Sequence, residues 1–437
     1  MDNKSKFWEE EIETMDRKSL EALQLERLKK TVGRASTSPY YKKLFAEKNI
    51  SPDKINSLED LQNIPFTTKE ELRNNYPYGF VAGSMKEAVR LHSSSGTTGN
   101  PTVVLHSKHD LDSWANLVAR CMYMVGLRDT DIFQNTSGYG MFTGGLGFQY
   151  GAERLGALTV PAAAGNTKRQ IKFIMDFGTT AIHAVPSYAI HLAETFREMG
   201  IDPIKETKLT TFLIGAEPHT EEQRKRIEEM MGVKAYNSYG LSEMAGPGIA
   251  FECVWQNGMH FWEDCYIVEI IDPETLEPVK EGEIGEMVLT ALDRTAMPLL
   301  RYRTRDLTRF IPGDCPCGRH HKRIDRMKGR SDDMFIVKGV NIFPMQIEKQ
   351  LMKYEQLASG YMITIQPTAT GDEIVVEVEL STLFSDDYSD LENLQKSITR
   401  SLKNEILVTP RVKLVQKGTI PRTEGKAVRV KDLRKLV

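Results

Sequence analysis

The chain has 437 residues, of which 40% are hydrophobic and 27% are charged, as in a globular protein with a substantial core. Its 57 basic and 60 acidic residues leave a net charge of −3, which gives no reason to expect binding to nucleic acid or to an anionic membrane. No run approaches the roughly 20 apolar residues that cross a bilayer, and residues 1–8 lack the apolar stretch of a secretory signal. Five cysteines do not suit a disulfide framework, so we expect a cytoplasmic protein.

The elements predicted in chain order begin with a helix, because Leu20, Leu23, Leu25, Leu28 and Val32 recur at roughly helical spacing. The middle of the chain then alternates strands and helices, with strand-like runs at 180–185, 209–214 and 233–237. This alternation predicts an α/β fold whose parallel sheet is covered by helices, with ligands beyond the carboxyl ends of its strands.

The last hundred or so residues have a different pattern. Two alternating runs, 362–365 and 373–380, flank a turn and predict a hairpin, and Leu391, Leu394, Ile398 and Leu402 then share the face of a helix. We therefore expect two domains, a large one over 1–330 and a small α+β one over 331–437.

A loop rich in glycine and hydroxyl groups precedes the strand-like run 102–105. Its glycines allow backbone N–H groups to turn inward and its hydroxyls add donors, so it can wrap a polyphosphate. The candidate residues are Ser94, Ser95, Gly96, Thr97, Thr98 and Gly99. A flexible linker is the alternative, although a linker would not normally lie between two apolar runs. The missing Gly-Lys-Ser/Thr ending weighs against an ordinary phosphotransferase.

The segment Ser94–Pro101 resembles the phosphate loop of the adenylate-forming enzymes, the acyl-CoA synthetases and their relatives. Five further motifs of that family follow in order: Gly215-Ala216-Glu217-Pro218 on the adenine side, Tyr239-Gly240-Leu241-Ser242-Glu243, the ribose motif Tyr302-Arg303-Thr304-Arg305-Asp306, the hinge Gly329-Arg330-Ser331-Asp332-Asp333-Met334, and the lysine motif Pro421-Arg422-Thr423-Glu424-Gly425-Lys426. The resemblance implies a large domain that binds ATP and an acid, and a small mobile domain joined to it by a hinge at Asp332.

The stretch 138–147, with 150–156, resembles the phenylacetate–CoA ligase branch of that family rather than the fatty acyl-CoA synthetases. This implies an ATP-dependent ligase that converts an aryl acid such as phenylacetate to its CoA thioester through an acyl-adenylate, with release of AMP and pyrophosphate. It also implies a homodimer. Tyr139 and Phe142 are candidate walls of the acid pocket, because the glycines around them leave volume for a flat ring. A mobile loop with incidental aromatic residues is the alternative.

Attack of a carboxylate on the α-phosphate of ATP builds up charge on phosphate oxygens, so catalysis needs positioning, a divalent cation and a positive side chain. By resemblance, Lys426 bridges the substrate carboxylate and the α-phosphate; a solvated surface lysine is the alternative. Glu243 can hold Mg²⁺ or cap a following helix, and Ser242 can donate to a phosphate. Asp306 can accept from both ribose hydroxyls, and an ion pair with a neighbouring arginine is compatible with that role.

The remaining candidates concern adenine and CoA. Tyr236 or Tyr239 can pack against adenine, although aromatic residues at strand ends are as often part of the core. Arg330 is a further candidate for the ribose or the phosphate. By resemblance, rotation at Asp332 brings the turn Lys338–Gly339 to the CoA entrance; an ordinary linker turn is the alternative.

A separate group of soft ligands predicts a metal site. Its members are Cys253, His260, Cys315 and Cys317. Three thiolates and one imidazole match a closed, tetrahedral zinc site of a structural kind. His320 or His321 could replace the histidine and Cys265 the first cysteine, and packed free thiols are the other alternative. Cys121 and Cys265 are expected in the core.

Two other functions stay open. The adenylate could pass to a carrier-protein thiol or an amine instead of CoA. The chain could also be a nucleotide-binding protein without activity, although the presence of Lys426, Glu243 and Asp306 weighs against a decayed site.

Overall fold

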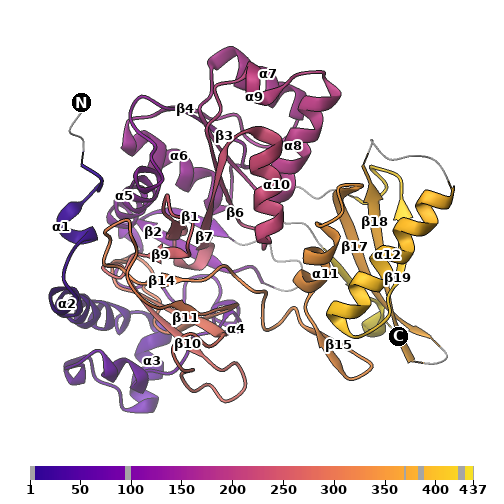
Figure 1. Ribbon diagram of the computed structural model, residues 1–437. Coiled ribbons are helices and arrows are strands. Elements are labelled where there is room, and N and C mark those ends of the chain that lie inside the picture. Colours follow the sequence, from indigo (N-terminus) through magenta and orange to yellow (C-terminus); the bar gives the residue numbers. More distant parts are fainter. Residues whose placement is uncertain (1–4, 94–99, 369–370, 382–387, 422–428, 437) are drawn as a thin grey trace. The chain divides into compact units, whose positions relative to one another are not determined.

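The computed structural model describes residues 5–93, 100–368, 371–381, 388–421 and 429–436 (Figure 1). The chain forms two compact units. The first comprises residues 1–183, 208–216 and 236–326, and the second comprises 184–207, 217–235 and 327–437. The predicted division into domains 1–330 and 331–437 stays a prediction. Within the described residues, no helix is both long enough and apolar enough to cross a membrane.

A nine-stranded sheet forms the centre of the fold, in the order β13-β14-β9-β8-β7-β6-β5-β3-β4. Its strands are β3 (Ile132–Asn135), β4 (Leu158–Val160), β5 (Ala181–Ala184), β6 (Thr211–Gly215), β7 (Lys234–Leu241), β8 (Gly246–Glu252), β9 (Met259–Phe261), β13 (Phe310–Ile311) and β14 (Arg323–Ile324). β3 pairs in parallel with β4 and β5, whereas β8 is antiparallel to β7 and β9, and β14 is antiparallel to β9 and β13. The predicted parallel sheet is therefore one end of a mixed sheet.

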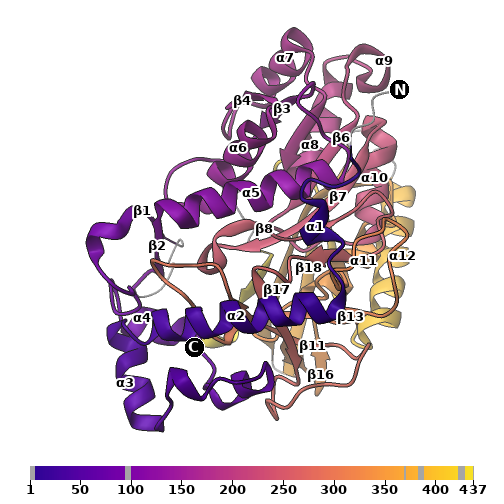
Figure 2. The same cartoon turned by 90° about the vertical axis from the view of Figure 1, so that its left-hand side faces the viewer.

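Helices of the first unit cover this sheet and form a separate N-terminal layer (Figure 2). They are α1 (Glu10–Glu13), α2 (Arg17–Ala35), α3 (Pro39–Lys48), α4 (Lys69–Asn74), α5 (Lys108–Met124), α6 (Thr143–Leu155) and α7 (Thr167–Phe177). The helix predicted around Leu20, Leu28 and Val32 is confirmed as α2, with these three side chains buried. α5 and α6 pack against each other and against β8.

Glycines on α6 make that packing possible. A Cβ on Gly147 would lie 2.5 Å from the Trp114 ring, and one on Gly151 would lie 2.3 Å from Val118. At Gly147 the missing side chain therefore lets two helices approach closely. Whether other glycines of this stretch leave volume for a substrate ring stays a prediction.

Two smaller sheets complete the first unit. β1 (Ala88–Ser93) and β2 (Val103–Ser107) form an antiparallel pair, and β10 (Tyr266–Ile271), β11 (Gly285–Ala291) and β12 (Tyr302–Thr308) form an antiparallel sheet. Short 3₁₀ turns lie at η1 (Pro52–Lys54), η2 (Glu59–Asn63), η3 (Met85–Glu87) and η4 (Ser242–Met244).

The second unit contains a four-stranded sheet in the order β19-β18-β17-β20. Its elements are α8 (Pro186–Glu198), α9 (Pro203–Glu206), α10 (Glu221–Met231), β15 (Phe335–Val337), β16 (Val340–Ile342), α11 (Pro344–Leu351), β17 (Leu357–Thr368), β18 (Gly371–Leu380), α12 (Tyr388–Ile406), β19 (Arg411–Val415), β20 (Val430–Asp432) and η5 (Leu433–Leu436). The predicted hairpin is β17 and β18, and Leu394, Ile398 and Leu402 are buried on one face of α12, as expected.

Candidate active site

The end of β6 approaches β7 closely, and the predicted adenine-side motif begins there. A Cβ on Gly215 would lie 2.3 Å from Ser238 Oγ, so only glycine permits this spacing. Ser238 Oγ donates to Ile214 O at 3.0 Å, and Ala216 turns the chain with a φ of +66°. Glu217 and Pro218 follow in the second unit, where Glu217 Oε2 accepts from Ser187 N at 3.2 Å.

Two motifs predicted separately meet at Tyr239 and Asp306. The Tyr239 hydroxyl donates to Asp306 Oδ2 at 2.6 Å, although the residues are 67 positions apart in the chain. Arg305 has a φ of +68°, and Asp306 N donates to Thr304 Oγ1 at 3.1 Å, so a local turn of the backbone orients the carboxylate. This pairing joins the tyrosine motif to the ribose motif.

Neighbouring side chains complete this region. Arg303 and Arg305 both pair with the buried Glu286. Tyr236 and Tyr239 are themselves buried, at 6% and 9% exposure. Gly240 is needed where β7 meets β8, because a Cβ there would lie 2.0 Å from Gly246 O.

Glu243 lies in the 3₁₀ turn η4 and is only 5% exposed. Its Oε1 accepts from Thr102 Oγ1 at 3.3 Å and lies 3.4 Å from Lys69 Nζ. The strand β8 follows η4 directly, so the alternative in which Glu243 caps a helix is wrong. Ser242 Oγ lies 3.0 Å from Thr143 Oγ1, at the start of α6.

Arg294 connects the turn η4 to β2, the strand that follows the glycine–hydroxyl loop in the sequence. Its side chain is 5% exposed and donates to Glu243 O at 2.6 Å and to Leu105 O at 3.0 Å. Sequence reasoning missed both Arg294 and Lys69, because neither belongs to a recognisable motif. The capping box of Thr68 and Glu71 could have predicted the start of α4 beside Lys69, but not a role for the lysine.

The loop with Tyr139 and Phe142 is attached to the last residue of β1. Met141 O accepts from Ser93 N at 3.0 Å and lies 3.1 Å from His92 Nδ1. Asn135 Nδ2 donates to the Tyr139 hydroxyl at 3.1 Å, whereas Phe142 is 46% exposed at the start of α6. The two predicted walls therefore differ: Tyr139 is held by Asn135 of β3, whereas Phe142 faces solvent.

A buried histidine lies beside this loop. His183, in β5, stacks on Phe148 with ring centroids 3.8 Å apart, and its Nδ1 lies 2.8 Å from Ser137 Oγ. Burial lowers the pKa of His183 to about 3, so its ring is neutral at physiological pH. Sequence reasoning did not single out His183, because it lies within a strand-like run and belongs to no motif of the candidate site.

In the second unit, Arg330 and Asp332 form an ion pair, with Arg330 Nε 2.8 Å from Asp332 Oδ1. Gly329 beside them has a φ of +134°. Lys338 and Gly339 are the two residues between β15 and β16, and both have positive φ, +52° and +77°, as in a type I′ hairpin turn. Both are exposed.

Two groups of predicted site residues lie outside the described residues. They are Ser94, Ser95, Gly96, Thr97, Thr98 and Gly99 of the glycine–hydroxyl loop, and Lys426.

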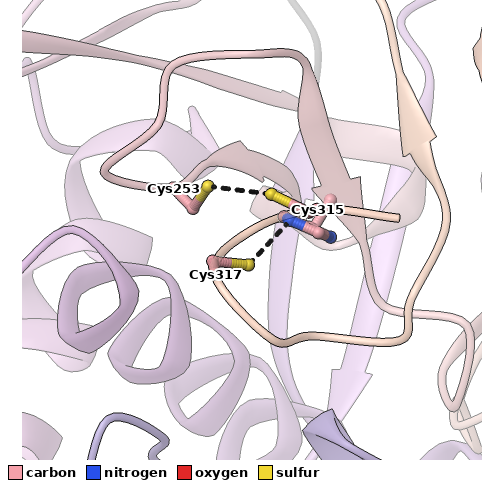
Figure 3. A group of neighbouring side chains, drawn as sticks. Cys253, Cys315 and Cys317 are labelled. Carbon is pink, nitrogen blue, oxygen red and sulfur yellow. Dashed lines mark hydrogen bonds between the residues drawn. The ribbon is translucent and has the colours of Figure 1, made fainter. Parts of the chain in front are cut away.

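The predicted metal ligands do come together. The ligand atoms of Cys253, His260, Cys315 and Cys317 all lie within 4.8 Å of one another. Figure 3 shows the three cysteine side chains of this group. This group could hold a metal ion. His321, one alternative ligand, instead accepts from Glu263 N through Nδ1, at 3.1 Å.

The other thiols are elsewhere in the first unit. Cys265 lies beside Asp264 and Arg27, so it does not replace Cys253. Cys121 is fully buried and accepts from Trp262 Nε1 at 3.2 Å, so both are core residues as predicted.

Comparison with known proteins agrees with the motifs. Residues 24–291 match the AMP-binding enzyme family, and residues 339–434 match the AMP-binding enzyme C-terminal domain. The chain therefore belongs to the AMP-binding enzyme family, whose members activate acids as adenylates, and the predicted fold class is confirmed.

Within that family, the chain is similar over nearly its whole length to phenylacetate-coenzyme A ligases. It is 44% identical to the one from Thermus thermophilus, over 98% of this chain and 100% of the relative. It is 42% identical to the one from Escherichia coli, over 98% of each. Its fold matches the crystal structure of 2-hydroxyisobutyryl-CoA ligase in the postadenylation state, with a TM-score of 0.93 and 30% identity over 100% of this chain and 94% of that one.

Proposed function

We propose that this protein is an AMP-forming ligase that joins phenylacetate to CoA at the expense of ATP. The observation that carries the proposal is the 42–44% identity to phenylacetate-coenzyme A ligases across nearly the entire chain. Two observations support it. The Tyr239 hydroxyl donates to Asp306, so the tyrosine and ribose motifs meet, and the carboxylate of Glu243 is buried beside Lys69.

In the first half-reaction, a carboxylate oxygen of the acid attacks the α-phosphorus of ATP. The bond from that phosphorus to the bridging oxygen breaks, and pyrophosphate leaves with the electron pair. The proposed role of Lys426 is to bring the two anions together. The main-chain N–H groups and hydroxyls of Ser94–Gly99 bind the phosphates.

Glu243 is the proposed ligand for Mg²⁺, a hard cation that supplies charge neutralisation on the phosphates. A carboxylate that is 5% exposed and lies 3.4 Å from Lys69 Nζ fits such a role, because a hard cation prefers carboxylate oxygens and could take the place of that contact. Ser242 donates to a phosphate, and Lys69 becomes a second positive group for the released pyrophosphate.

Asp306 is the proposed acceptor for the ribose hydroxyls, oriented by Tyr239. The hydrogen bond from that tyrosine occupies one carboxylate oxygen, Oδ2, and so fixes the plane in which the other can accept. Gly215, Ala216, Glu217 and Pro218 would line the adenine, with Tyr236 and Gly240 on the neighbouring strand. Arg330 is proposed to assist at the ribose or the phosphate.

Tyr139 and Phe142 are the proposed walls of the acid pocket, with the neutral His183 ring close to their loop. A neutral histidine suits a pocket for an apolar aryl group better than a protonated one, because a buried imidazolium would need an anionic partner that the aryl group does not supply.

In the second half-reaction, the sulfur of CoA attacks the acyl carbon, the bond from that carbon to the AMP oxygen breaks, and the thiol proton passes to solvent. Asp332 is the proposed hinge at which the small domain turns between the two steps. The turn Lys338–Gly339 is proposed to line the CoA entrance, where an exposed lysine can meet a phosphate of CoA.

Two further assignments accompany the enzyme. The cluster of Cys253, His260, Cys315 and Cys317 is proposed to hold a structural zinc ion. The protein is proposed to act as a homodimer, on the basis of the family resemblance alone.

The test is a panel of aromatic and short aliphatic acids, scored by acid-dependent formation of AMP and pyrophosphate with and without CoA. We expect phenylacetate to give the highest kcat/KM and CoA to accelerate turnover. Formation of ADP would contradict the adenylate chemistry. Faster turnover with a carrier-protein thiol or an amine than with CoA would show that CoA is not the preferred acceptor of the acyl group.

The match to 2-hydroxyisobutyryl-CoA ligase provides a second candidate substrate, a small hydroxy acid. The same panel separates the two, because 2-hydroxyisobutyrate lacks the ring that Tyr139 and Phe142 are proposed to bind.

A further inference from the structure

Two distances in the Cys/His cluster are close to those between the ligands of a tetrahedral zinc ion. Cys253 Sγ lies 3.6 Å from Cys315 Sγ, and Cys317 Sγ lies 3.3 Å from His260 Nε2 (Figure 3). Ligands about 2.3 Å (sulfur) and about 2.0 Å (nitrogen) from a zinc ion are roughly 3.5–3.8 Å apart at the corners of a tetrahedron. The 3.6 Å between the two sulfurs is also well beyond the roughly 2.05 Å of a disulfide bond.

The histidine is oriented as a ligand. His260 Nδ1 lies 2.9 Å from His321 O, so it donates its proton to that carbonyl and leaves Nε2 free to face the sulfurs. Such a hydrogen bond to a backbone carbonyl is the usual support for a histidine bound to a metal.

The four ligands come from two separate pieces of chain. Cys253 and His260 flank the connection between β8 and β9, while Cys315 and Cys317 lie in the connection between β13 and β14. The second connection is a tight turn in which Gly318 N donates to Cys315 O at 3.0 Å. An ion in the cluster therefore fastens the segment 315–321, here called the knuckle, to the central sheet.

The knuckle in turn holds residues 5–15, here called the N-terminal arm. Arg319 Nε donates to Glu13 Oε2 at 2.6 Å, and these two side chains are 3% and 0% exposed. The main chain is paired as well, since His320 N donates to Glu13 O at 3.0 Å and Arg319 Nη2 donates to Lys6 O at 3.1 Å.

One residue connects the ligand set to the arm directly. The main-chain carbonyl of His321 accepts a hydrogen bond from His260 Nδ1. The ring of His321 accepts a second hydrogen bond, from Glu263 N to Nδ1. Its proton is therefore on Nε2, which donates to Ile12 O at 3.1 Å. The path from metal ligand to arm consists of two consecutive hydrogen bonds.

We infer that the zinc ion acts as a clamp, fixing the knuckle so that Arg319 and His321 hold the N-terminal arm against the rest of the first unit. A buried ion pair such as Arg319–Glu13 is stable only while its geometry is kept, so loss of the ion leaves the arm only its contacts with α5, such as that between Glu9 and Arg120. The inference rests on the proposed zinc ion and is independent of the proposed catalytic activity.

The experiment compares the full chain before and after zinc is removed with a chelator, using metal analysis and hydrogen exchange. We expect about one zinc ion per chain as purified. After removal, amides of the arm should exchange at least ~10-fold faster, while those of the α2 core should stay protected, because the arm opens locally. Trypsin should then cleave after Lys6 or Arg17 sooner than in the zinc-bound protein.

Three variants separate the metal from the clamp. Cys317→Ser should lower the zinc content and release the arm, whereas Cys265→Ala removes a buried thiol outside the cluster and should do neither. Arg319→Gln should release the arm with zinc still bound. A purified chain without zinc, or with a disulfide between Cys253 and Cys315, would overturn the site. Unchanged exchange of the arm after removal of bound zinc would overturn the clamp.

Discussion

The short hydrogen bond between Tyr239 and Asp306 shows how single residues prepare the candidate site. An O–H donor 2.6 Å from a carboxylate oxygen forms a charge-assisted bond, which is stronger than a bond between neutral groups. The carboxylate is thus held in one orientation before any ribose arrives, and a ligand binds without the cost of ordering it.

Tyr239→Phe removes that donor and keeps the ring. We expect KM for ATP to rise about tenfold, since a hydrogen bond to a charged group contributes about 1.5 kcal/mol, with a smaller change in kcat. Steady-state kinetics of AMP formation checks this. Tyr266→Phe is the matched control, because the Tyr266 hydroxyl bonds to Met244 O within the core and its loss should lower Tm without raising KM.

Lys426→Ala tests the proposed cation. We expect carboxylate-dependent pyrophosphate release to fall about 10²–10³-fold, because a charge aimed at the transition state is lost, while ATP binding and Tm stay nearly unchanged. Lys431→Ala, an exposed lysine of β20, should retain activity. Pyrophosphate release at the wild-type rate in the Lys426 variant would remove that residue from the mechanism.

Local chemistry explains which site residues the sequence could reveal. Glu243 and Asp306 stand in short motifs whose spacing marks them, and the four metal ligands are recognisable by residue type. Arg294 was not predictable, since it acts on carbonyls 51 and 189 positions away and no local pattern records such partners. Lys69 was missed for the same reason.

At the scale of elements, α6 shows two opposite uses of glycine in one helix. Gly147 lies against Trp114 and Pro247, with no space for a methyl group, whereas a Cβ on Gly144 would meet nothing within 4 Å. The first glycine permits packing against α5, and the second only weakens the helix.

Gly147→Ala and Gly144→Ala should therefore change stability in opposite directions. We expect the first to lower the free energy of unfolding by about 1–3 kcal/mol through overpacking. The second should raise it by about 0.5–1 kcal/mol through helix propensity. Denaturant titration of both variants checks this, and a loss of stability in both would show that space around α6 is tighter than described.

The elements themselves were predictable where periodicity was strong. α2, the β17–β18 hairpin and the buried face of α12 follow the apolar spacing. The antiparallel strands β8, β9 and β14 were not foreseen, because short buried strands carry no signal of direction. A chain reversal after η4 decides the direction of β8.

For the whole molecule, one buried carboxyl should shape the dependence of stability on pH. The pKa of Glu348 is raised to about 7, mainly by burial and also by the charge of Glu217, while Arg429 and the Tyr361 hydroxyl oppose the shift. A raised pKa means that the folded state prefers the neutral form. The stabilising contribution is complete below the unfolded pKa of 4.5 and is lost as pH rises through about 7.

Glu348→Gln keeps the neutral form at every pH. We expect its Tm to equal that of the wild type near pH 4.5 and to exceed it at pH 8, because the variant has no charge to bury. Thermal unfolding of both proteins at several pH values between 4.5 and 8 checks whether the difference in Tm grows with pH. Glu392→Gln, at an exposed carboxyl of α12, should show no such difference between the two pH values.

Alternation between the two half-reactions is the other property of the whole molecule. Asp332→Pro fixes φ at the proposed hinge, so we expect adenylation and thioester formation, each measured in single turnover, to be slowed unequally. Asp332→Ala, which loses the Arg330 ion pair but leaves the backbone free, should slow neither step much. Equal slowing of both steps by proline would contradict the hinge.

The acceptors chosen by Arg294 have a consequence for redesign of the enzyme. Its guanidinium holds two peptide carbonyls, at Leu105 and Glu243, and a peptide carbonyl is the same whatever amino acid supplies it. An apolar substitution at position 105 can thus leave the link between β2 and η4 in place, whereas loss of Arg294 removes both of its hydrogen bonds at once. Libraries aimed at new acids should therefore leave the arginine alone.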